Sequence, residues 1–132
     1  MLINTPISLG ELVDKISILM IKQEKITDKK KLLLINEELS LLQKKLNEVA
    51  QKDNNDKGQI FSFLKKLKEI NFELWEIEDK IRDCERKKNF GKDFIALARS
   101  VYITNDKRAE LKKEINHIFD STIYEVKSYQ EY

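Results

Sequence analysis

The 132-residue sequence contains a single cysteine and no hydrophobic run long enough to cross a membrane. A lone cysteine, Cys84, cannot form a disulfide within the chain, which excludes the cross-links that stabilise small secreted domains. A bilayer-spanning helix needs about 20 consecutive apolar residues, and no stretch approaches that length. The first residues also lack the basic segment and apolar run of a secretory signal. We therefore expect a cytoplasmic protein that has no membrane partner.

An excess of charge of one sign is also lacking. Twenty-five Lys and Arg residues against 23 Asp and Glu residues give a formal net charge of +2, and the two signs alternate along the chain. This balance offers no electrostatic basis for nucleic-acid binding. Glycine (three) and proline (one) are scarce, whereas charged residues make up 36% of the chain and hydrophobic residues 41%. Such a profile is typical of long solvated helices, and the length fits one domain over residues 1–132.

Apolar residues that recur every three or four positions predict four helices. Their expected ranges are about 8–26, 28–52, 59–89 and 93–119, with a tail over 120–132. The second helix has a strict heptad seam, formed by Leu32, Ile35, Leu39, Leu42, Leu46 and Val49. The pattern predicts an all-α fold, an antiparallel four-helix bundle made of two long helical hairpins.

Residue types at the helix ends predict how the helices begin and stop. Ser8 and Glu11 form a capping box before the first helix, and Asp28 is placed to cap the second. A polar cluster at residues 53–58 predicts the loop between the hairpins. Gly91 is expected to end the third helix in the left-handed conformation, and Asp93 to cap the fourth.

The size of the third predicted helix favours self-association. Thirty residues of helix extend roughly 45 Å. A round domain of this length has a diameter of about 36 Å. Apolar residues that lie off the seams, among them Phe61, Phe72 and Trp75, would then face water unless something covers them. We therefore expect a homodimer, with another protein as a further possible partner.

Standard catalytic signatures are missing, so no catalytic residue and no cofactor are predicted. The one histidine, His117, is interpreted as a helix-terminal residue, and Cys84 as a small buried residue of the third helix. Glu73, Glu76 and Asp79 share one helix face and could offer oxygen ligands to Mg²⁺. Surface ion pairs explain the same spacing more simply, so no metal site is assigned.

The arginines are concentrated in one part of the chain. Lysine is the usual base here, yet Arg82, Arg86, Arg99 and Arg108 all fall within residues 82–108. The guanidinium group offers a planar fork to a carboxylate or phosphate, which lysine cannot imitate. Thr104 and Arg108 also interrupt the apolar stripe of the fourth helix. Two interpretations stay open: an ion pair of Arg108 or Arg99 with Asp14 or Asp79 that sets the register, or a small anion pocket inside the bundle.

Several strings in the sequence are distinctive together: GELVDKISIL at 10–19, LWEIEDKIR at 74–82, LARSVYITNDKRA at 97–109 and KSY at 127–129. With them the chain resembles a family of short, uncharacterised helical proteins of bacteria and phages. The resemblance spans nearly the whole chain and implies a set of residues that belong to the family pattern, with Asp106 among them. The others in this set are our ligand-binding candidates: Glu11, Asp14, Lys15, Trp75, Glu78, Asp79, Arg82, Arg99, Tyr102, Asn105 and Arg108. Met20 and Val126 depart from the family pattern, which has acidic residues at those places.

Two functions are compatible with these observations. The first is a self-associating helical module, which the resemblance connects with sugar or surface-polysaccharide metabolism, because such sequences occur fused or adjacent to glycosyltransferase-type proteins. The second is a small enzyme or binding protein for a phosphorylated or anionic metabolite, such as a nucleotide or nucleotide sugar, with Mg²⁺ as a potential requirement. Whether the protein is an enzyme stays open.

Overall fold

The computed structural model describes residues 1–52 and 57–132. Within them the chain forms four helices and no strand. The helices are α1 (Leu9–Lys25), α2 (Lys29–Lys52), α3 (Lys57–Arg86) and α4 (Lys92–Ile118). The predicted all-α fold is therefore confirmed. Of the predicted loop at 53–58, residues 53–56 lie outside the described part, and Lys57 and Gly58 belong to the first turn of α3.

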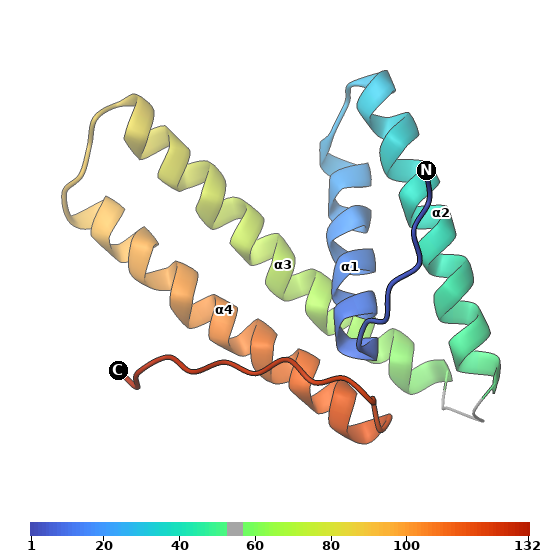
Figure 1. Cartoon of the computed structure of the whole chain (residues 1–132). Helices are drawn as coiled ribbons and strands as arrows, with labels where there is room; N and C mark the ends of the chain where they lie inside the picture. Colours follow the sequence, from blue (N-terminus) through green and yellow to red (C-terminus); the bar gives the residue numbers. More distant parts are fainter. Residues whose placement is uncertain (53–56) are drawn as a thin grey trace.

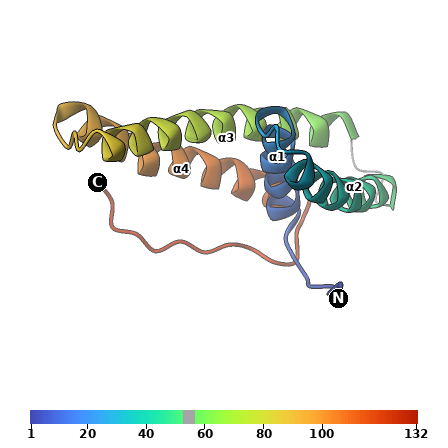
Figure 2. The same ribbon diagram turned by 90° about the horizontal axis from the view of Figure 1, so that it is seen from above.

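The helices form two hairpins that cross each other instead of running side by side (Figure 1). Helix α1 packs against each of the other three helices, whereas α2 rests mainly on α1. Over the described residues, α2 makes no contact with α4. The outer half of the α3–α4 hairpin consequently projects beyond the α1–α2 hairpin. The two chain ends lie on one side of the molecule, where the C-terminal tail follows α4 (Figure 2).

Two of the predicted helix starts are confirmed by their hydrogen bonds. The Ser8 hydroxyl accepts from the backbone N–H of Glu11 at 3.1 Å. The Asp28 carboxylate likewise accepts from the backbone N–H of Lys31 at 2.9 Å. Each bond satisfies a donor that has no partner within its helix. The Glu11 carboxylate does not complete the capping box, because it pairs with Lys112 on α4.

The turn between α3 and α4 corrects two predictions. Gly91 is not a left-handed residue, since its φ is −81° and it stands at the N-cap of α4. The left-handed residue is Lys88, with φ 53°. It allows the N–H of Asn89 to reach back to the carbonyl of Cys84 at 2.9 Å, which closes a Schellman motif before Gly91 is reached. Asp93 lies in the first turn of α4 and does not cap it.

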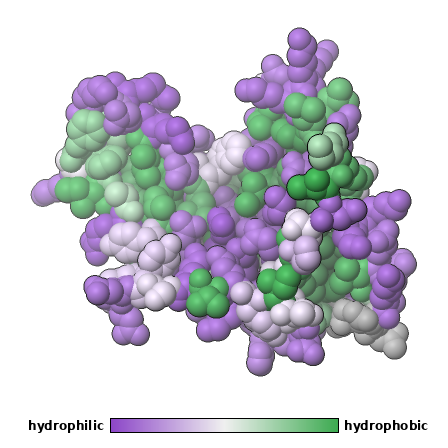
Figure 3. Space-filling model, viewed as in Figure 1, coloured by the Kyte–Doolittle hydropathy of each residue, from purple (hydrophilic) through white to green (hydrophobic). Residues whose placement is uncertain are grey.

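The core is built around α1. Val13 and Ile16 of α1 are completely buried, and so is Leu67 of α3. The seam of α2 contributes to the same cluster through Ile35, Leu39 and Leu46. Ile115 is the buried residue that α4 adds to it. Apolar surface left outside this cluster is visible over the upper part of the α1–α2 hairpin and over the outer end of the α3–α4 hairpin (Figure 3).

Candidate functional site

A buried carboxylate lies where α1 crosses the α3–α4 hairpin. Asp14 is 1% exposed. The Asn71 side-chain amide of α3 donates to Asp14 Oδ1 at 2.8 Å and to Ser17 Oγ at 2.7 Å. The Ser17 hydroxyl donates in turn to the main-chain oxygen of Asp14 at 2.7 Å. On α4, Arg108 Nε lies 3.6 Å from Asp14 Oδ1. Three helices are thus joined through one acidic side chain.

This arrangement explains the polar interruption in the apolar stripe of α4. A buried carboxylate is costly unless a cation and hydrogen-bond donors surround it. Arg108 supplies the cation, and its side chain is 30% exposed while that of Asp14 is 2% exposed. The structure therefore contains the ion pair with Asp14, the first of the two open interpretations. Arg108 also borders a cavity, so the ion pair is compatible with the other interpretation, a small anion pocket inside the bundle.

That cavity is a groove of about 460 Å³ between α1, α3 and α4, called the central groove below. It is lined by Ile18, Ile21, Asn71, Leu74, Trp75, Glu78, Asp79, Arg82, Asn105 and Arg108. Six of these residues are ligand-binding candidates from the sequence, namely Trp75, Glu78, Asp79, Arg82, Asn105 and Arg108. Asp14 is joined to the groove through Asn71 and Arg108. Half-buried Trp75 lies beside apolar Leu74 and Ile18 at its wall.

The charges in the central groove are almost balanced. Arg82 lies 3.8 Å from Glu78, one helical turn away, and both side chains are largely exposed. An exposed pair at this distance contributes little to stability, so either partner can turn to a ligand. Arg108 is held by the buried Asp14 instead. The groove thus combines one fixed guanidinium, one free to reorient, two carboxylates at Glu78 and Asp79, and an indole.

Besides Asp14, four sequence candidates do not line the central groove. Glu11 binds Lys112 on α4, with Oε2 at 2.9 Å from Nζ. Lys15 and Arg99 are exposed. The ring of Tyr102 meets that of Tyr132 edge to face, with centroids 5.2 Å apart. These positions are structural contacts or surface, so a role in the same site is not supported for them.

Sequence reasoning missed a second polar centre that ties α1 and the tail to α4. Lys112 is 4% exposed, and its ammonium lies 2.9 Å from both Glu11 Oε2 and Glu125 Oε2. Burial opposes its charge, but the hydrogen bonds to the two carboxylates outweigh burial and raise the pKa of Lys112. The same hydrogen bond lowers the pKa of Glu125 against the opposing effect of burial. Lysine is so common in this chain that nothing in the sequence distinguished Lys112.

Asn71 and Asn116 were also missed. Asn71 directly follows Ile70, one of the apolar residues that recur every three or four positions along the third predicted helix, so this spacing places it at the edge of the apolar stripe. Asn116 is 2% exposed, and its side-chain oxygen accepts from the N–H of Gly10 at 2.7 Å. The one available signal was Gly10 itself, because a glycine inside a helix often marks a close contact. A Cβ at this position would lie 2.6 Å from the carbonyl oxygen of Lys112.

The remaining candidates for chemistry lie apart from the groove. His117 is exposed near the end of α4, and Cys84 is buried near the end of α3. Among residues 1–52 and 57–132, no three His, Cys, Asp or Glu side chains gather as a metal site would require. Glu76 pairs with Lys25 at 3.3 Å, which joins the end of α1 to α3.

No helix in the described residues is long and apolar enough to cross a membrane.

Comparison with known proteins identifies the family. The sequence model of a family of unknown function, DUF6165, matches residues 3–132. Because the match covers nearly all of the chain, the protein belongs to this family. No curated protein and no solved structure matches it.

Proposed function

We propose that this member of the DUF6165 family binds a nucleotide or a nucleotide sugar in the central groove. The observation that carries the proposal is the meeting of six sequence-predicted residues in one groove, above the buried Asp14. Its volume of about 460 Å³ lies within the range of small-molecule sites. Such sites combine apolar walls with a few polar groups that orient the ligand, as the central groove does.

The groups in the groove match the parts of such a ligand. The indole of Trp75, beside Leu74, offers a flat apolar surface for a base or for the face of a sugar ring. Arg82 and Arg108 offer planar forks to phosphate oxygens. The carboxylates of Glu78 and Asp79 can accept hydrogen bonds from sugar hydroxyls.

The two arginines are expected to differ in their roles. Arg108 is held by Asp14, so its position is set before any ligand arrives. Arg82 is 72% exposed and only loosely paired with Glu78. A phosphate can replace that weak surface pair at small cost, because the pair itself contributes little. We expect Arg108 to position the ligand and Arg82 to close on it.

The balance of charge narrows the ligand class further. Glu78 and Asp79 offset the two arginines, and Asp14 lies behind them. A free phosphate therefore finds no excess positive potential in the groove. Affinity must therefore come from two contacts together: the base or sugar ring on Trp75 and the phosphate on the arginines. This favours a nucleotide or nucleotide sugar over inorganic phosphate.

We propose binding and no reaction. A role next to sugar or surface-polysaccharide metabolism rests on the resemblance of the sequence alone. The geometry of the central groove adds no support for it. A cytoplasmic location fits the single, buried Cys84, which leaves the chain without an internal disulfide.

Isothermal titration calorimetry of the purified full chain tests the proposal. The titrants are a uridine and a guanosine diphosphate sugar, the matching nucleoside diphosphates, and inorganic phosphate. We expect saturable heats for at least one nucleotide-based ligand and none for phosphate. Arg82→Ala should weaken that binding about tenfold or more, the size expected for a charged hydrogen bond.

Arg86→Ala is the matched control. Arg86 lies one turn beyond Arg82 on α3, has the same 72% side-chain exposure and pairs with Asp83. It does not line the central groove, so its loss should leave the affinity unchanged. An unchanged affinity in Arg82→Ala, or the absence of heat with every nucleotide and nucleotide sugar, would refute the proposal.

A further inference from the structure

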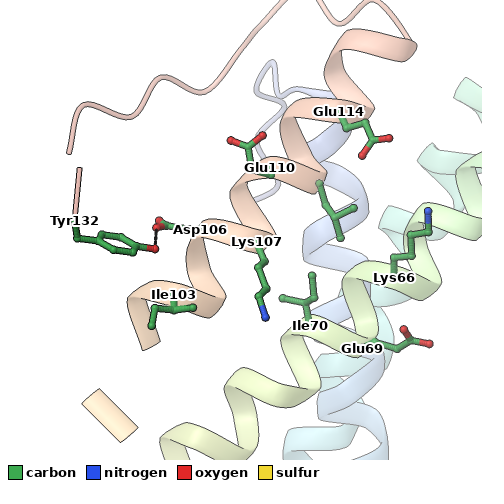
Figure 4. A pocket seen from close by; sticks show the side chains of 10 residues that line it. Lys66, Glu69, Ile70, Ile103, Asp106, Lys107, Glu110, Glu114 and Tyr132 are labelled. Carbon is green, nitrogen blue, oxygen red and sulfur yellow. Dashed lines mark hydrogen bonds between the residues drawn. The ribbon is translucent and has the colours of Figure 1, made fainter. Parts of the chain in front are cut away.

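A second groove lies between α3 and α4 (Figure 4). It shares no lining residue with the central groove. Its volume is about 650 Å³. Ile70 of α3 and Ile103 and Leu111 of α4 form its apolar floor, and each is only partly buried. Tyr132 lies at one end, where its hydroxyl donates to Asp106. We call this surface the outer groove.

The rim of the outer groove carries an excess of negative charge. Four carboxylates border it, from Glu69, Asp106, Glu110 and Glu114. Two ammonium groups, those of Lys66 and Lys107, oppose them. An apolar floor inside such a rim suits a helix that presents apolar residues flanked mostly by bases.

The chain itself has a helix face of this kind. On α2, Leu33, Leu34 and Leu41 are 62%, 66% and 52% exposed. They lie on the side of α2 away from the buried seam that packs on α1. Three leucines exposed to this degree on one helix face are unusual unless another surface covers them.

The two surfaces are complementary in spacing and charge. Leu34 and Leu41 are seven residues apart, about 10 Å along the helix. Ile103 and Leu111 in the floor of the outer groove are eight apart, about 12 Å. The exposed charged residues three or four positions from these leucines are Lys29, Lys30, Lys31, Glu37, Glu38, Lys44 and Lys45. Five bases and two acids thus face four acids and two bases.

We propose that α2 of a second copy of this chain docks in the outer groove and that the protein is a homodimer held by this contact. The α2 helix cannot reach the groove of its own chain, since it makes no contact with α4 in the described residues. A two-fold axis uses the contact twice, with each α2 in the outer groove of the other copy. Each groove then becomes a three-helix contact of α3, α4 and the incoming helix. This proposal is independent of any ligand in the central groove.

Sedimentation equilibrium of the full chain over a wide concentration range is the first test. We expect a species of twice the 15.7 kDa chain mass. The double variant Leu34→Gln/Leu41→Gln should shift it to the monomer while far-ultraviolet circular dichroism stays unchanged, because both side chains are exposed. The matched control is Ile95→Gln/Ile118→Gln on α4, where two exposed apolar side chains are lost outside the outer groove.

Charge reversal makes the test specific. Lys30→Glu/Lys44→Glu and Glu110→Lys/Glu114→Lys each put like charges opposite each other, so each variant alone should be monomeric. Mixed in equal amounts, they should recover a dimer that contains one chain of each kind, since both contacts of that pair are again complementary. A monomeric wild-type chain, dimers that survive the leucine and charge variants, or a mixture that stays monomeric would overturn the proposal.

Discussion

The two halves of α4 differ in what they bury, although they belong to one continuous helix. Residues 92–103 lie on the outer part of the α3–α4 hairpin (Figure 1), and none of them is fully buried. From residue 104 onward, α1 crosses the hairpin, and Thr104, Lys112, Ile115 and Asn116 are buried. Where only α3 and α4 are in contact, the seam between them stays open to water on both sides. Residues of α4 are fully buried only where α1 also covers this seam.

The buried half of α4 is also the polar half. Three of its four buried residues carry polar side chains. The partners of two of them, Lys112 and Asn116, lie on α1 and in the tail. Within the described residues, every buried side-chain nitrogen and oxygen has a hydrogen-bond partner. Such a satisfied network holds its elements in one arrangement, whereas an apolar seam tolerates sliding. The difference indicates that the crossing of α1 over the hairpin is set by polar contacts.

Replacing one isoleucine in each half of α4 should give the largest difference in the free energy of unfolding. Ile115 is 1% exposed and Ile95 is 55% exposed. Ile115→Ala should lower the free energy of unfolding by about 2–5 kcal/mol, because it leaves a cavity beside α1. Ile95→Ala should change it by less than about 0.5 kcal/mol. Urea unfolding followed by circular dichroism measures both, and equal losses would contradict the division of α4 into two halves.

Two glycines test the same difference between the buried and the open half of α4, because each leaves a different amount of space for an added Cβ. A Cβ on Gly10 would lie 2.6 Å from the Lys112 carbonyl oxygen and 2.8 Å from Asn116 Oδ1, both on the buried half of α4. Gly10→Ala must push α1 away from α4, and we expect a loss of about 1–3 kcal/mol.

Gly91, at the start of the open half, is the control. Its nearest neighbour to an added Cβ is Asn89 Oδ1 at 3.4 Å, and its φ is −81°. Gly91→Ala should cost less, about 0.5–1 kcal/mol from the poorer N-cap. Thermal unfolding of the two variants decides between these values. If Gly10→Ala is as stable as Gly91→Ala, α1 and α4 are not in close contact.

A substitution in the C-terminal tail should have the smallest effect on the free energy of unfolding, and this effect should depend on pH. Lys112 lowers the pKa of Glu125 below its usual 4.5. A lowered pKa in the folded chain contributes stability above the unfolded pKa, and this contribution is lost as the pH falls through the folded pKa. Because the Glu125 side chain is 40% exposed, Glu125→Gln should cost only about 0.5–1 kcal/mol at neutral pH.

The pH profile separates the ion pair from simple packing. The difference between wild type and Glu125→Gln should shrink as the pH falls below about 4.5, where Glu125 of the unfolded chain becomes protonated, and should vanish once the pH has passed the lower pKa of the folded chain. Urea unfolding at a series of pH values measures it. A difference that stays constant across the acid range would show that the contact with Lys112 is not ionic.

Particular residues show how far the sequence alone could lead. Heptad positions such as Ile35, Leu39 and Leu46 were predicted as a seam and are buried. Ser8 and Asp28 were predicted as caps and act as caps. Gly91 was assigned wrongly, because the Schellman turn of Lys88 depends on a hydrogen bond to Cys84 that residue type does not reveal. Lys112 could not be told apart from the many exposed lysines.

The candidate site divides in the same way. The interruption of the apolar stripe at Thr104 and Arg108 predicted that something polar meets this part of α4. Which partner it meets, Asp14 or Asp79, stayed open, and the involvement of Asn71 was not predicted. The central groove was not predictable as a cavity, because its walls come from three helices distant in the sequence.

By itself the sequence determined the helices, most of their ends and the stripe that each one buries. These features depend on interactions between residues at most a few positions apart, and a period of 3.6 residues makes them visible in the order of amino acids. Only the tertiary structure decided that the hairpins cross at Asp14, that Lys112 is buried between two carboxylates, and that Trp75, Arg82 and Asn105 share one groove. Such contacts depend on the angle at which the hairpins meet, and that angle results from the packing of all four helices together.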